Sequence, residues 1–153
     1  MFNIFKKKSP QFFTEKQQEE IVAAIQQAET STSGEIRIYV ESRCSYVDAI
    51  DRAQELFVKL KMFETQQRNA VLLYLAMEDK QLAIFADSGI FQKTGKEYWN
   101  NQVKTMIAGF NQNDYVNSIV RVILEIGQTL SAAFPYDAAT DRNELPDEIV
   151  YGK

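Results

Sequence analysis

The sequence predicts an α/β fold, a three-layer α/β/α sandwich with a small mixed sheet of three or four strands and about four helices. The unbroken apolar run at residues 71–77 suits a strand that is covered on both faces. A second apolar run, residues 81–86, follows the polar residues 78–80 closely, so we expect an antiparallel hairpin. Alternating apolar and polar residues over 36–41 predict an earlier strand.

The first two helices are predicted from their end signals and their apolar spacing. Thr14 and Gln17 have the spacing of a capping box, so a helix begins there and stops in the polar run at residues 30–34. Apolar residues at helical spacing over about 46–62 predict the second helix. Because this helix connects two strands of one sheet, we expect those strands to run parallel through a right-handed crossover.

Two more helices are expected after the hairpin. Apolar positions within residues 99–110 predict the third helix, for which a break near Gly95 is the alternative course. Apolar positions within residues 115–130 predict the fourth, which ends at Pro135.

A chain of 153 residues suits one domain. We divide it into a flexible N-terminal segment at residues 1–11, an α/β/α domain at 12–134, and an acidic C-terminal extension at 135–153. We expect this extension to pack on or near the domain.

The composition excludes several function classes. Lys and Arg number 17 against 21 Asp and Glu, and this net charge of −4 argues against binding to nucleic acid. The absence of histidine rules out a Ser-His-Asp triad and any zinc site that uses histidine. Cys44 is the single cysteine, so no internal disulfide forms and a reducing cytoplasm fits most simply. No apolar run approaches the roughly 20 residues of a membrane span.

Residues 1–8 have apolar side chains before three lysines, which is the wrong order for a secretory signal. The alternatives are a frayed terminus and a segment that rests loosely on an acidic membrane.

The predicted topology brings oxygen ligands to one end of the sheet. If the first two strands run parallel and the third returns, Glu35, Asn69 and Asp87 lie at the same end. Calcium takes six to eight oxygen ligands, so these residues are the candidate ligands of a divalent cation, calcium above all. The acidic tail residues are expected to return to the same end: Asp141, Glu144 and Asp147.

Purely structural roles are the alternative for these residues. Asp87 precedes Ser88 and Gly89, so it can cap the start of a helix. Glu35 can pair with Arg37 or Arg68. The other end of the sheet, roughly 20 Å away, carries a second acidic group, for which the alternatives are a second cation site and a solvated rim. Its members are Glu41, Asp48, Glu78 and Asp79.

The order of short motifs along the chain resembles the TPM domain, named for thylakoid-lumen, photosystem II and MOLO proteins. Trp99 and the later motifs resemble its short cytoplasmic bacterial branch. The match covers about residues 12–150. The motifs that carry it are Ser33-Gly34-Glu35, residues 68–74, Ala86-Asp87-Ser88-Gly89-Ile90, Asn113-Asp114-Tyr115, Phe134-Pro135 and residues 143–148.

The resemblance implies an α/β/α sandwich with a groove that binds divalent metal in some members, and a proposed phosphatase activity. Two positions depart from the family pattern: Ala86 stands where glycine is common, and Ser33 replaces a frequent threonine. If that glycine allows an unusual backbone conformation, alanine puts the local geometry in doubt. We therefore expect a cation-binding accessory or interaction module. The alternatives are a metal-dependent phosphatase acting on phosphomonoesters and a membrane-surface adaptor.

Overall fold

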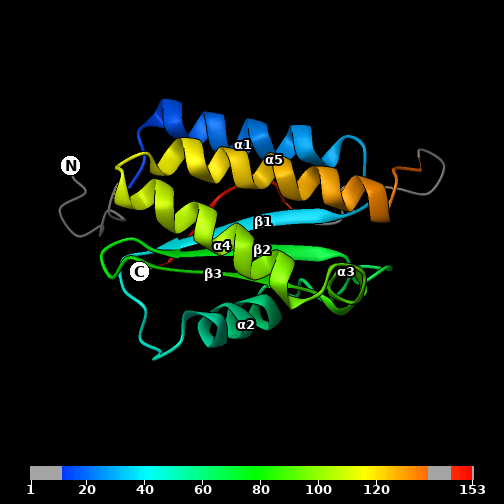
Figure 1. Ribbon diagram of the computed structural model, residues 1–153, viewed down its shortest axis with the longest axis horizontal. Coiled ribbons are helices and arrows are strands. Elements are labelled where there is room, and N and C mark those ends of the chain that lie inside the picture. Colours follow the sequence, from blue (N-terminus) through cyan, green and yellow to red (C-terminus); the bar gives the residue numbers. More distant parts are fainter. Residues whose placement is uncertain (1–11, 138–145, 153) are drawn as a thin grey trace, which may run out of the picture.

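The computed structural model describes residues 12–137 and 146–152, and it confirms the predicted α/β/α sandwich. Figure 1 shows α1 and α5 over one face of the sheet and α2 beneath the other. The elements in chain order are α1 (Glu15–Glu29), β1 (Glu35–Glu41), α2 (Ala49–Lys59), β2 (Ala70–Ala76), β3 (Gln81–Ala86), α3 (Ser88–Thr94), α4 (Lys96–Asn111), α5 (Tyr115–Ala133) and β4 (Val150–Tyr151).

The sheet has the order β3-β2-β1-β4. β1 pairs parallel with β2, and β2 pairs antiparallel with β3, as the sequence predicts. The fourth strand is β4, which runs parallel to β1 with Tyr39 opposite Val150. It has only two residues, so periodicity could not have located it. The C-terminal chain thus closes one edge of the sheet, while β3 forms the other edge.

The described chain has five helices, one more than the approximate number expected from the sequence. The third predicted helix is divided into α3 and α4 at Gly95, whose φ of 83° lies in the left-handed region. Glycine adopts this conformation without steric cost, so the chain can end one helix and begin the next there. At the start of α1 the predicted capping box of Thr14 and Gln17 is confirmed.

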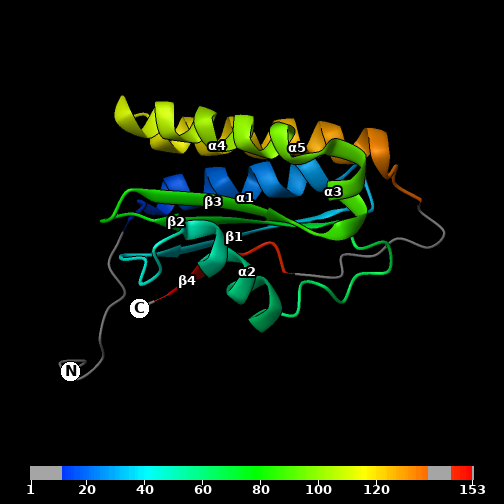
Figure 2. The same cartoon turned by 60° about the horizontal axis from the view of Figure 1, so that its bottom comes forward.

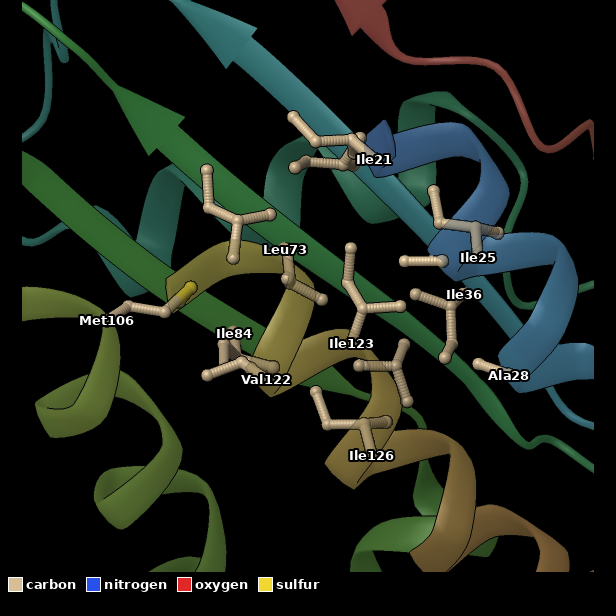
Figure 3. Packing of buried hydrophobic residues seen from close by; sticks show 14 of the residues in the cluster. Ile21, Ile25, Ala28, Ile36, Leu73, Ile84, Met106, Val122, Ile123 and Ile126 are labelled. Carbon is tan, nitrogen blue, oxygen red and sulfur yellow. The ribbon is translucent and has the colours of Figure 1, made fainter. Parts of the chain in front are cut away.

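The core occupies both faces of the sheet. Every residue of β2 is buried, which confirms that its continuous apolar run is covered on both sides. On the face under α1, α4 and α5, isoleucines and other large side chains from the helices meet those of the strands (Figure 3). On the opposite face, α2 packs Leu56 and Phe57 against alternate residues of β2 and β3. The larger core thus lies under three helices and the smaller one under α2.

Some predictions concern residues outside the described part of the chain. These are the flexible segment at residues 1–11, the membrane-contacting residues 1–8, and the tail acids Asp141 and Glu144. Among the described helices, none combines the length and hydropathy that crossing a bilayer requires.

Candidate functional site

The predicted ligands lie at the end of the sheet where β1 and β2 begin and β3 ends. The N–H of Glu35 donates to the carbonyl of Asn69 (3.4 Å), and the N–H of Asp87 donates to the carbonyl of Ala70 (3.0 Å). Three loops therefore meet here, as the parallel and antiparallel pairings require. Since β2 lies between β1 and β3, the backbones of Glu35 and Asp87 are about 10 Å apart.

Asp87 is buried, and both of its carboxylate oxygens have partners. Arg68 Nε donates to Oδ2 at 2.6 Å, and Arg68 Nη2 donates to Oδ1 at 2.8 Å. Oδ1 also accepts a hydrogen bond from the N–H of Ser88 at 2.7 Å, at the start of α3. The alternative role of Asp87 as a helix cap is thus confirmed. The guanidinium group places a positive charge beside both oxygens, where a metal ion would need to bind.

Gly89 keeps the loop before β2 in close contact with the start of α3. Its N–H donates to the carbonyl of Arg68 at 2.8 Å. A Cβ atom at this position would lie 2.1 Å from the carbonyl oxygen of Gln67, so no larger residue fits without backbone movement. This contact holds Arg68 in place for its ion pair with Asp87.

Asn69 is buried and only partly satisfied. Its Nδ2 donates to Ser33 Oγ at 3.2 Å, and its N–H donates to Thr65 Oγ1 at 3.3 Å. In the described part of the chain, Oδ1 has no hydrogen-bond partner. A buried acceptor left without a partner costs about 1–3 kcal/mol, so this oxygen is suited to accept a ligand contact.

Glu35, which is buried at the start of β1, lies near enough to Glu29 for its charge to act on that carboxyl group. Glu29 at the end of α1 accepts a hydrogen bond from the N–H of Ile36 at 2.8 Å, and it is hydrogen-bonded to Asp147. Burial, the bond with Asp147 and the charge of Glu35 raise the pKa of Glu29 to about 10, against the opposing effect of the Ile36 N–H. The raised pKa favours the protonated form of Glu29 in its bond with Asp147.

Glu29 is a residue that sequence reasoning misses. It is the last residue of α1, where a charged side chain is normally expected in solvent. The available signal is the short turn at residues 30–34, which returns the chain to the sheet so quickly that Glu29 and Glu35 stay close. The predicted return of Asp147 to this end of the sheet is confirmed by its contact with Glu29.

The opposite end of β1 carries a closed ion-pair network. Glu41 is buried and accepts hydrogen bonds from Arg52 Nε at 3.0 Å and Arg52 Nη2 at 3.1 Å, and also from the hydroxyl of Tyr74. The bonds to Glu41 raise the pKa of Arg52. Nearby, Asp79 accepts a hydrogen bond from the N–H of Cys44 at 2.8 Å. The expectation of a solvated rim is therefore wrong for Glu41, although Glu78 and Asp79 are exposed.

The oxygens of Glu29, Asp147 and Asn69 suit a cation better than those of Asp87. Within residues 12–137 and 146–152, no three His, Cys, Asp or Glu side chains are already arranged as metal ligands. The carboxyl oxygens of Glu29 and Asp147 and the amide oxygen of Asn69 are hard donors of the kind that calcium prefers. Asp87 does not fit this chemistry, because its oxygens already bind a guanidinium group.

Comparison with known proteins identifies the family. A family model described as the TPM domain matches residues 7–129. The chain belongs to the TPM domain family. An NMR structure of the BA42 protein from the psychrophilic bacterium Bizionia argentinensis is 36% identical, with a TM-score of 0.85 over 95% of this chain and 99% of that one. No curated protein matches the chain.

A similar fold is found in the N-terminal domain of the cg2496 protein from Corynebacterium glutamicum. Its NMR structure is 17% identical, with a TM-score of 0.61 over 81% of this chain and 85% of that one. This likeness shows the fold alone. The assignment to a short cytoplasmic bacterial branch of the TPM family stays a prediction.

The departure from the TPM pattern at Ala86 has a structural explanation. Ala86 is the last residue of β3 and lies opposite Val71. Ala86 is not one of the described residues that have a positive φ. Alanine therefore fits this strand without strain, and the close approach that needs glycine is at Gly89 instead.

Proposed function

We propose that this TPM domain is an accessory or interaction module that binds a divalent cation, with calcium preferred, at the start of β1. The observation that supports it is a hydrogen-bonded pair of carboxyl groups from separate parts of the chain, with a third carboxylate acting on one of them. Glu29 and Asp147 are hydrogen-bonded to each other, and the charge of Glu35 acts on Glu29. Like charges that converge in a buried place are held together by a shared proton or by a cation.

The cation takes the place of the proton in this proposal. With calcium bound, Glu29 is ionised, and its carboxylate and that of Asp147 supply the first ligands, while Glu35 adds negative charge. Calcium takes six to eight oxygens, so water and backbone carbonyls complete its shell. The bound ion supplies charge neutralisation, and it links the end of α1 to the chain that leads into β4.

The proposal gives different roles to the three residues predicted from sequence. Glu35 remains part of the cation site. Asn69 lies beside it, with its unsatisfied Oδ1 as a further acceptor. Asp87 holds Arg68 and caps α3, so it stabilises the neighbouring loop and does not bind the ion.

A calcium titration followed by backbone amide shifts tests the proposal. We expect localised shifts at residues 29–36 and at Asp147, and we expect Glu35→Gln to weaken binding about tenfold or more. Asp87→Asn is the matched control, because it removes a buried carboxylate at the same end of the sheet and leaves the shifts at residue 36 intact. The proposal is wrong if millimolar calcium causes no localised shift. Loss of the shifts in Asp87→Asn but not in Glu35→Gln would place the ion at Asp87.

A further inference from the structure

Within the described part of the chain, the edge strand β3 carries backbone groups that no neighbouring strand uses. The N–H of Asp87 donates to the carbonyl of Ala70 in β2. Since hydrogen-bonded residues alternate along an antiparallel pair, the N–H and carbonyl groups of Leu82 and Ile84 point away from β2. β3 is the last strand on its side of the described sheet. Along this edge Leu82 is partly exposed and Ile84 is 4% exposed. A strand edge without a neighbouring strand is a template for pairing with another extended chain.

A groove of about 520 Å³ follows this edge between α2 and α4. Its floor is formed by residues 81–84 of β3. Figure 2 shows β3 at the edge of the sheet, with α4 on one side and α2 on the other. The wall at α2 includes Val47 and Ile50, which are 94% and 45% exposed, and the wall at α4 includes Val103. Apolar walls on both sides of an open strand edge suit an extended chain whose alternate side chains are apolar.

The charge of the groove restricts what can bind there. Lys96 and Lys104 line it from α4, and Asp48 lines it from the start of α2. The groove is therefore locally basic on a chain whose net charge is −4. A second copy paired through the same edge would bring these lysines toward their counterparts. Residues 6–8 of the chain are all lysine, so the N-terminal segment carries the same unfavourable sign.

We propose that this groove binds an extended segment of a partner protein, which adds a strand to β3. The segment has apolar side chains at alternate positions and an acidic residue that faces Lys96 or Lys104. The outward groups of Leu82 and Ile84 supply main-chain hydrogen bonds, and Val47, Ile50 and Val103 contact the apolar side chains. Main-chain bonds give affinity in this mode of recognition, and the side-chain contacts give specificity.

Panning a library of random dodecapeptides against the full chain tests the proposal. We expect enriched sequences that alternate apolar residues and contain acidic residues, and a synthetic copy should shift the amides of residues 81–84. Lys104→Glu should weaken its binding about tenfold, whereas Arg121→Glu, a charge reversal at an exposed position on α5, should leave binding unchanged. N-methylation of the peptide amides that face β3 should abolish binding, and N-methylation one residue along should not.

Three results would overturn the proposal. The first is that no peptide is enriched, and the second is that enriched peptides shift residues elsewhere or bind Lys104→Glu as well as the unaltered chain. The third is concentration-dependent self-association with shifts at residues 81–84, which would make a second copy the occupant of this edge.

Discussion

β1 holds a buried glutamate at each end, and different charged groups lie beside the two. Glu35 is 2% exposed and Glu41 is 5% exposed, and both lie on the same face of the strand. Glu41 is bound by the guanidinium of Arg52 and the hydroxyl of Tyr74. Glu35 lies instead near the hydrogen-bonded carboxyl pair of Glu29 and Asp147.

The difference shows that burial of a carboxylate does not by itself indicate a binding site. At Glu41 an opposite charge and a hydroxyl donor stabilise the ionised form, so the site is complete without a ligand. At the Glu35 end, burial and neighbouring acids raise the pKa of Glu29, which favours a proton or a cation there. The two ends therefore predict different responses to mutation, pH and calcium.

The largest expected effect comes from leaving Glu41 without its guanidinium partner. Arg52→Ala should lower the free energy of unfolding by about 3–5 kcal/mol, because it leaves a buried carboxylate uncompensated. Urea unfolding followed by the fluorescence of Trp99, the single tryptophan, measures this change. Arg43→Ala is the control, since the ion pair of Arg43 with Glu78 is exposed and contributes little. A loss below about 1 kcal/mol for Arg52→Ala would show that Glu41 does not depend on this pair.

For each pH unit, a smaller effect is expected from titration at the other end of β1. The pKa of Glu29 is raised from 4.5 to about 10, so its stabilising effect is complete below the lower value and is lost as the pH rises. Between these values the folded chain holds a proton that the unfolded chain has released. Without calcium, stability should therefore fall by up to about 1 kcal/mol per pH unit from this group.

Glu29→Gln sharpens this test. The amide oxygen can still accept the Ile36 N–H, but the side chain no longer titrates. The variant should lose the negative slope of stability against pH, whereas Glu20→Gln, an exposed change on the same helix, should keep it. Equal slopes in both variants would exclude Glu29 as the titrating group.

Most of the fold could be predicted from the sequence because its signals are local. The apolar run of β2, the turn after it and the capping box at Thr14 each specify their element from a few neighbouring residues. β4 could not be predicted, because two residues are too few to show an alternation of apolar and polar side chains. Their pairing with β1 depends on tertiary contacts. The division at Gly95 was only an alternative, because one glycine inside a helical pattern does not always break it.

The candidate site could be predicted only as a place in the fold. Strand polarity correctly brings Glu35, Asn69 and Asp87 to one end of the sheet. Sequence gives no information on which charged partner each side chain meets, so Arg68 was considered only as a partner of Glu35, and its ion pair with Asp87 was not predicted. The role of Glu29 was missed for the same reason, because its burial depends on the packing of the chain around Asp147.

Calorimetric titration of calcium in neutral buffers that differ in ionisation heat tests the central claim most directly. The buffer dependence of the measured heat gives the number of protons released for each ion bound. We predict release of about one proton by the unaltered chain and none by Glu29→Gln, because the ion replaces the proton held between Glu29 and Asp147. Calcium binding without proton release, or release that is unchanged in Glu29→Gln, would contradict the account.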